Sequence, residues 1–104
     1  MNDETLHIAE IPYENGNIKF RYSRIMSEDG TKWIRQGLFQ AFHENGEISS
    51  EGNYENGLED GVWKDYHDNG KLAAQGKFKE GKEVGIWQYW DNSGKPEATE
   101  SFDK

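Results

Sequence analysis

The stretch from residue 66 to residue 87, YHDNGKLAAQGKFKEGKEVGIW, belongs to a pattern that recurs along the chain with a constant period of 24. Each recurrence contains a glycine followed two residues later by a large aromatic residue, at 37 and 39, 61 and 63, and 85 and 87. A fixed period of this kind is typical of a repeat array, in which each unit buries its apolar residues against its neighbours. The 104 residues are therefore predicted to form one domain of repeated supersecondary units.

Within each unit the residue pattern is that of strands and turns. The segments 48–54 and 72–78 place their large residues at even spacing, as a β-strand with one buried face requires. Asn45-Gly46 and Asn69-Gly70 bound these segments, and both residue types tolerate the positive φ of a tight hairpin turn. The sequence predicts an all-β fold, an elongated, twisted antiparallel meander of seven or eight strands in a single sheet.

Two glycines lie in the middle of predicted strands, where they weaken β-propensity unless a side chain covers the bare backbone. Gly52 and Gly76 hold this position, and the rings of Trp63 and Trp87 are large enough to cover them. These two tryptophans are therefore predicted to belong to the core.

The first unit is longer than the others. Residues 12–18 match residues 42–48 at a spacing of 30, so six residues are inserted, and we expect them to lengthen a hairpin that runs from Ile18 to Met26, turns at 27–30 and returns through Trp33 and Ile34. The predicted organisation is a lead-in strand or cap over 1–11 and a repeat array over 12–102. The array is divided into units 12–41, 42–65 and 66–89 and a partial unit 90–102.

Composition restricts the class of partner. The chain has 20 acidic and 12 basic residues, a net charge of −8 and no cysteine. The acidic excess disfavours direct binding to nucleic acid and to anionic lipid, which are polyanions, and favours a basic partner. The N-terminus has neither a basic start nor an apolar run, so no signal peptide and no membrane insertion are expected, and the predicted location is the cytoplasm.

The unit 66–87 resembles the MORN-variant repeat of bacterial YwqK-type antitoxins, because the aromatic residue, Asn-Gly, Gly-x-aromatic and Gly-x-Trp elements occur in the same order. The resemblance extends over about residues 12 to 102. It implies an array of β-hairpin repeats and a role as an antitoxin or immunity protein.

The charge pattern suggests where a partner would bind. No Lys or Arg occurs between Arg35 and Lys64. One interpretation is an acidic stripe that steers a basic partner, and the other is a solvated sheet whose charges pair across neighbouring strands. Exposed aromatic residues near the C-terminal end would add contact area. The predicted partner-binding residues are Glu44, Glu47, Glu51, Glu55, Glu59, Asp60, Asp65, Asp68, Tyr89 and Trp90.

No catalytic, cofactor or metal motif occurs in the sequence. His43 and His67 occupy equivalent repeat positions, which indicates a structural role in neighbouring turns. We therefore expect a protein that binds another protein, a basic toxin or effector whose active site it occludes, and no enzymatic activity. The alternative is a scaffolding protein whose free sheet edges pair with another copy, which makes a homo-oligomer possible.

Overall fold

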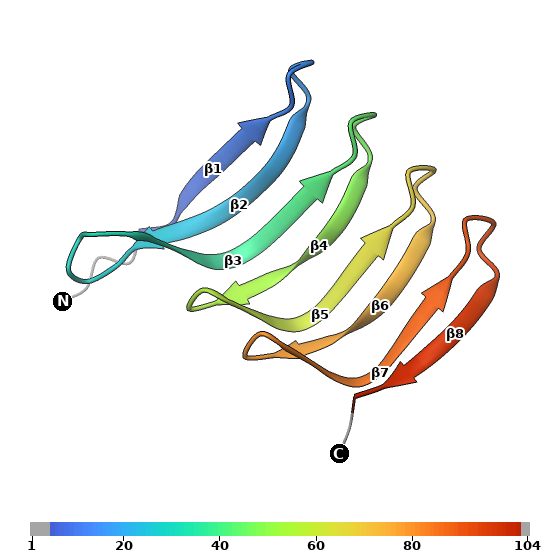
Figure 1. Ribbon diagram of the computed structural model, residues 1–104. Helices are drawn as coiled ribbons and strands as arrows, with labels where there is room; N and C mark the ends of the chain where they lie inside the picture. Colours follow the sequence, from blue (N-terminus) through green and yellow to red (C-terminus); the bar gives the residue numbers. More distant parts are fainter. Residues whose placement is uncertain (1–4, 103–104) are drawn as a thin grey trace.

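A computed structural model describes residues 5–102, which form one antiparallel sheet of eight strands arranged in chain order (Figure 1). The strands are β1 (His7–Pro12), β2 (Ile18–Met26), β3 (Trp33–Phe42), β4 (Ile48–Glu55), β5 (Leu58–Tyr66), β6 (Leu72–Lys79), β7 (Lys82–Trp90) and β8 (Pro96–Ser101). The sheet is one layer thick, with extents of 48 × 42 × 16 Å. This arrangement confirms the predicted all-β meander. Residues 1–4 of the predicted lead-in segment lie outside the described residues.

The described part of the chain contains no helix, and therefore none that is long and apolar enough to cross a membrane.

Two kinds of turn alternate along the chain and lie at opposite ends of the strands (Figure 1). Asn56-Gly57 and Glu80-Gly81 are two-residue turns in which both residues have positive φ, as a type I′ hairpin requires. At the other end, only the glycine of each Asn-Gly pair has positive φ, for example Gly46 at 94°. The hairpin turn lies at Asn45-Gly46 as predicted, but Asn45 closes it with its side chain: Oδ1 accepts a hydrogen bond of 2.9 Å from the amide of Glu47.

The hairpin of the first unit is longer than the others, as expected from its six inserted residues. β2 and β3 are joined by residues 27–32, and Asp29 organises this loop. Its Oδ1 accepts hydrogen bonds of 2.7 Å from both Ser27 Oγ and Thr31 Oγ1, and these bonds lower the pKa of the Asp29 carboxyl.

Glycines inside the strands shape the sheet. Gly37, Gly61 and Gly85 stand in β3, β5 and β7 with positive φ between 71° and 92°. The strand pairing shifts register close to each of them, which is the mark of a β-bulge. Bulges bend the strands that carry them, and the strands in Figure 1 are visibly curved.

The core is a row of aromatic rings along one face of the sheet. A Cβ atom added to Gly76 would overlap the indole of Trp87, so the ring rests directly on the glycine backbone, and Gly52 and Trp63 repeat this arrangement. Trp87 is 4% exposed and its Nε1 donates a hydrogen bond of 3.2 Å to the carbonyl of Lys77. The predicted covering of both glycines is confirmed. The ring contacts continue across the sheet through Phe39, Tyr54, Trp63, Phe78, Trp87 and Phe102.

Candidate functional site

The face opposite the aromatic row carries a line of exposed aliphatic side chains, which we name the aliphatic row. It consists of Ile8, Leu38, Val62 and Ile86, which are 63%, 46%, 46% and 57% exposed. Each precedes a buried residue of the aromatic face, such as Trp63 after Val62, and successive side chains of a strand point to opposite faces. Every second strand therefore contributes one exposed aliphatic side chain to the same face.

A shallow groove of about 310 Å³ lies between two members of this row. Val62, Val84 and Ile86 line it together with three polar side chains and two glycines, Gln75, Lys77, Gln88, Gly76 and Gly85. A Cβ atom at Gly76 would point to the aromatic face, where it would overlap the indole of Trp87, so the glycine accounts for the seat of the tryptophan and not for the groove.

Polar side chains run beside the aliphatic row, paired from strand to strand. Arg21 and Glu10 form an ion pair of 2.8 Å, and Gln40 donates a hydrogen bond of 3.0 Å to Glu51. Glu51 is also the cross-strand partner of Lys64. Acidic and basic side chains therefore stand on neighbouring strands along this line, and Glu51 lies between Gln40, which donates a hydrogen bond to it, and the basic Lys64.

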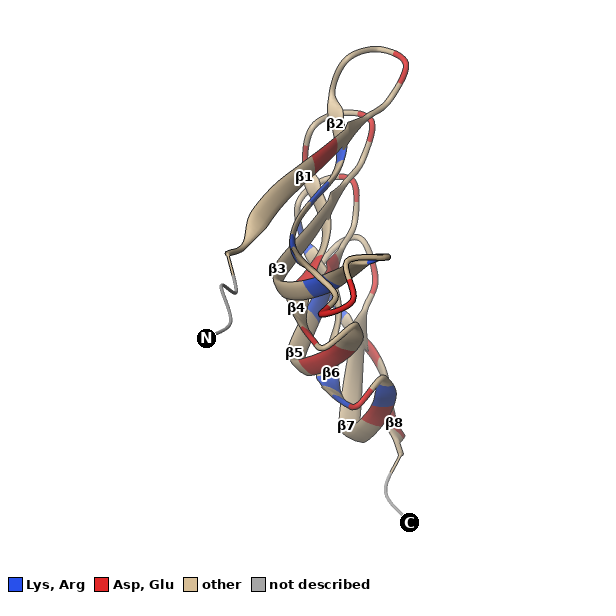
Figure 2. Cartoon of the chain, turned by 90° about the vertical axis from the view of Figure 1, so that its left-hand side faces the viewer, with Lys and Arg blue, Asp and Glu red and all other residues tan. Residues whose placement is uncertain are grey.

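The eight predicted acidic residues do not form one patch, because the sequence between Arg35 and Lys64 crosses several strands and turns at opposite ends of the sheet. Acidic residues recur along successive turns in Figure 2, with basic residues mixed among the strands. Four locations result. Glu44, Glu47 and Asp68 lie in the long turns, Glu55 and Glu59 near the two-residue turns, Glu51 and Asp60 on the aliphatic face, and Asp65 on the aromatic face.

The two predicted aromatic contact residues are half-buried. Tyr89 donates a hydrogen bond of 3.1 Å to Glu100 Oε1. Loss of solvent around the phenol, that hydrogen bond and the nearby carboxylates raise the pKa of Tyr89. Trp90 uses its carbonyl to accept a hydrogen bond from His67 Nε2. Both residues are therefore engaged within the sheet, although part of each side chain remains open to solvent.

His43 and His67 connect neighbouring turns. Each Nε2 donates a hydrogen bond of 2.9 Å to the backbone carbonyl of the residue 23 positions further on, Tyr66 for His43. Tyr13 holds the equivalent position in the first unit and donates its hydroxyl to the carbonyl of Phe42 at 2.7 Å. Within residues 5–102 no three acidic or histidine side chains come together in a way that could hold a metal ion.

Sequence reasoning missed the aliphatic row. Its signal was present, since Leu38, Val62 and Ile86 recur with the period of the array, between the repeated glycine and the repeated aromatic residue. A hydrophobic residue that recurs in this way is normally assigned to the core. In a single-layer sheet, however, only one face can be covered by the chain's own aromatic rings.

Comparison with known proteins gives one match. A family model described as MORN repeat variant matches residues 35–56, 59–80 and 83–104, and the starts of these segments share the period of the glycines. No curated protein and no solved structure matches the chain.

Proposed function

Because the chain belongs to the MORN repeat variant family, we propose that it is a protein-binding module that uses its aliphatic row as the centre of the interface. The observation that carries this proposal is the recurrence of an exposed aliphatic side chain at the same repeat position in Ile8, Leu38, Val62 and Ile86. The row alternates with polar positions, since Asn53 of β4 is paired with Leu38 and Lys77 of β6 with Val62. A surface that combines apolar and polar side chains in this way is typical of protein interfaces.

The charges around this row favour a basic partner. Glu44 and Glu47 lie at one end of the strands, and Glu55 and Glu59 lie at the other. An apolar centre with a charged, solvated rim is the usual anatomy of a protein interface. Acidic rims speed the approach of a basic protein and orient it before the apolar centre makes contact.

The specific role that we propose is that of an antitoxin or immunity protein, which neutralises a basic toxin or effector by covering its active site. The resemblance of the repeat unit to that of YwqK-type antitoxins supports this role, as does the net charge of −8. A sheet one layer thick presents a broad face relative to its mass, which suits occlusion of a cleft.

The interface is tested by polar substitution in the aliphatic row. The chain is co-expressed with the product of a toxin-like reading frame adjacent to its gene, and the double variant Val62→Asn and Ile86→Asn is compared with the wild type. Protection of growth should be lost while circular dichroism is unchanged, because both side chains are half exposed. Leu58→Asn is the matched control, since Leu58 is 47% exposed but lies outside the row. Full protection by the folded double variant would show that the row is not the interface.

Charge steering is tested separately by the kinetics of association with the same toxin. The association rate is measured as added salt shortens the Debye length from about 30 to about 10 Å. The triple variant with Glu51, Glu55 and Glu59 changed to Lys should associate more slowly than the wild type, and its rate should depend less on salt. The matched control changes Glu14, Glu28 and Glu97 to Lys, which alters the net charge by the same amount at residues outside the predicted set. An equal decrease in both triple variants would mean that net charge alone acts, without a role for the predicted acidic residues.

The alternative function is a scaffold that self-associates through its sheet edges. The observation in its favour is that β8 is an edge strand of the described sheet and every one of its residues is exposed. Against it, β8 begins with Pro96 and carries Glu97 and Glu100, which are features that discourage edge-to-edge pairing. Sedimentation of the isolated chain distinguishes the two, since a monomer at high concentration excludes the scaffold.

A further inference from the structure

The first unit departs from the rest of the array at one cross-strand pair. In the second and third units, an aromatic residue of one strand faces a glutamate of the next, as Tyr54 faces Glu59 and Phe78 faces Glu83. At the equivalent place in the first unit, Arg24 of β2 faces Arg35 of β3. Two like charges directly opposite each other destabilise a sheet. The first unit therefore has a repulsive arginine pair where the other units have an aromatic residue and a glutamate, and a bound anion would offset that repulsion.

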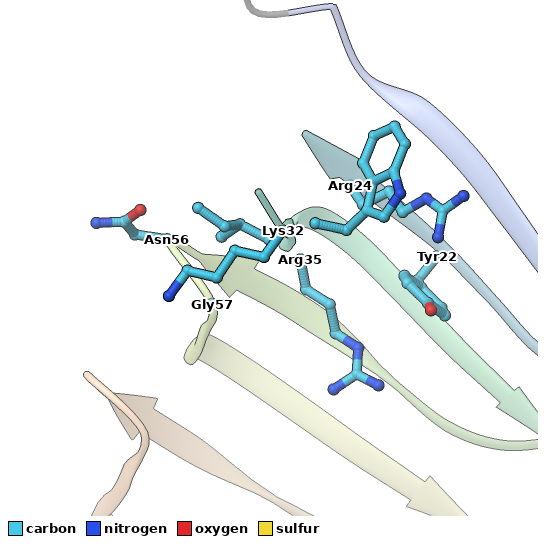
Figure 3. A pocket seen from close by; sticks show the side chains of 8 residues that line it. Tyr22, Arg24, Lys32, Arg35, Asn56 and Gly57 are labelled. Carbon is cyan, nitrogen blue, oxygen red and sulfur yellow. The ribbon is translucent and has the colours of Figure 1, made fainter. Parts of the chain in front are cut away.

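The two arginines line a pocket of about 520 Å³ at the end of the β2–β3 hairpin (Figure 3). Lys32, which comes from the inserted loop, adds a third cationic side chain. The remaining lining residues are Tyr22, Trp33, Ile34, Asn56 and Gly57. A chain with a net charge of −8 thus concentrates three positive charges around one cavity and places no acidic residue in the part of the wall that the structure describes.

Aromatic rings hold both guanidinium groups in place. The Cζ atom of Arg24 lies 4.1 Å from the centre of the Trp33 ring, and that of Arg35 lies 4.9 Å from the centre of the Tyr22 ring. A guanidinium stacked on a ring keeps the N–H groups at its edge available for a ligand. Nε of Arg24 is buried and has no hydrogen-bond partner among the described residues, a state that costs free energy unless an acceptor is bound.

Two acidic residues of the adjacent segments, Asp29 and Glu55, are engaged with neutral side chains. Asp29 accepts hydrogen bonds from Ser27 and Thr31, and Glu55 accepts one of 3.1 Å from Gln36. In the part of the chain that the structure describes, the one ion pair is that of Arg21 with Glu10, so no carboxylate there forms an ion pair with the three cations of the pocket. Glu59, the cross-strand partner of Tyr54, acts together with Arg35 on the Tyr54 phenol, and the remaining positive charge of the pocket is left for a ligand to balance.

We propose that this pocket binds a phosphate monoester dianion. Two arginine forks and an ammonium group offer more donors than the two oxygens of one carboxylate accept, whereas a phosphate monoester brings three terminal oxygens and nearly two charges. The cavity is larger than a phosphate group, which leaves space for the organic group that carries it. The proposal rests on the arginine pair alone and is independent of the aliphatic row.

Phenyl phosphate is the first probe. Benzoate is the control ligand, because it has a similar ring but a carboxylate with a single negative charge. Binding is followed by calorimetry and by the indole N–H resonance of Trp33 in ¹H–¹⁵N spectra. Phenyl phosphate should shift that resonance and bind at least about tenfold more tightly than benzoate. Glucose 6-phosphate in parallel distinguishes a small metabolite from a phosphorylated aromatic side chain as the source of the phosphate. Absence of binding by both phosphates at millimolar concentration, or equal binding of benzoate, would overturn the proposal.

Variants then locate the site. Arg24→Gln and Arg35→Gln should each weaken phosphate binding by about tenfold or more, since each removes a charged hydrogen-bond donor. Arg21→Gln is the matched control, because Arg21 lies on the same strand and loses the same charge but is paired with Glu10.

Arg35→Glu restores the residue type that the array uses at Glu59 and Glu83. It should abolish phosphate binding and raise the melting temperature, because it converts a repulsive pair into an attractive one. An equal loss of affinity in Arg21→Gln, or unchanged affinity in Arg35→Glu, would contradict the assignment.

Discussion

Gly76 shows how one absent side chain determines the packing of the aromatic face of the sheet. Its bare backbone seats the indole of Trp87, whose ring rests directly on the glycine. Any Cβ at this position would overlap the indole, so the tryptophan, which is only 4% exposed, would have to leave its place in the core.

Gly76→Ala is therefore expected to lower the free energy of unfolding by about 1–3 kcal/mol, although alanine is the better strand residue in an ordinary context. Urea unfolding followed by circular dichroism measures the change. In a Trp87→Leu background the same substitution should cost much less, because the overlapping ring is absent, and the difference between the two backgrounds reports the pairwise clash. Equal costs in both backgrounds would show that the indole does not impose the glycine.

At the scale of the element, the long turns are connected to one another by side-chain hydrogen bonds. His67 Nε2 donates to the carbonyl of Trp90, and Asn69 Nδ2 donates to that of Asn92 at 2.7 Å. Equivalent bonds from His43 and Asn45 repeat one unit earlier. The hairpins are thereby fixed relative to each other outside the strand ladders.

Replacing His67 by Leu is expected to reduce stability by about 1 kcal/mol, because the carbonyl of Trp90 loses its donor. Thermal unfolding followed by circular dichroism measures the change. His67→Gln keeps an N–H group near the same place and should reduce stability less. Replacing both histidines by Gln should leave partner binding largely intact. Loss of binding by that double variant while it remains folded would contradict a purely structural role.

The last long turn depends on one ionised carboxylate. Asp91 Oδ1 accepts hydrogen bonds from the hydroxyl and amide of Ser93 and from the amide of Lys95. These bonds, that of the Ser93 hydroxyl foremost, hold the pKa of Asp91 below its usual 3.8. A lowered pKa means that the stabilisation is complete above the unfolded pKa and is lost as the pH falls through the folded value.

The amide resonances of Ser93 and Lys95 should therefore move toward random-coil positions in an acid titration with a midpoint below 3.8. Asp91→Asn keeps an acceptor oxygen but does not titrate, so its spectrum should show no such inflection. An inflection that persists in the Asn variant would assign the transition to another group.

At the scale of the whole molecule, the strands pack mainly against their neighbours in the sheet order. In such an array stability is approximately a sum of unit and interface contributions. Insertion of a second copy of residues 59–82 after Lys82 preserves the period and should give a folded protein with a higher melting temperature. Calorimetry provides the measurement, and a lower melting temperature than that of the parent would argue against additive units.

Much of this architecture was predictable because it depends on pairs of residues at fixed repeat positions. A tryptophan and a glycine in adjacent strands complement each other in size, so Trp63 over Gly52 could be inferred without coordinates. Hairpin positions followed from glycine spacing. The conformation of Asn45 was not predictable, since asparagine closes a turn either with its backbone or with its side chain.

The candidate sites were harder to predict. The aliphatic row looks like core in the sequence, because periodic hydrophobic residues are buried in most arrays and only the single-layer structure exposes Val62. The pairing of Arg24 with Arg35 depends on the register across an irregular loop and on the bulge between Tyr22 and Arg24. Neither is fixed by residue type alone.

The meander places the first and last strands, β1 and β8, at opposite edges of the sheet (Figure 1). Tension applied between these two strands would act along the interstrand hydrogen bonds, which run perpendicular to the strands in an antiparallel sheet. Such a pull opens the bonds of one strand in succession and does not shear a whole ladder at once. The protein should therefore unfold under mechanical force one strand at a time, beginning at an edge of the sheet. Each unit should release a similar length of chain.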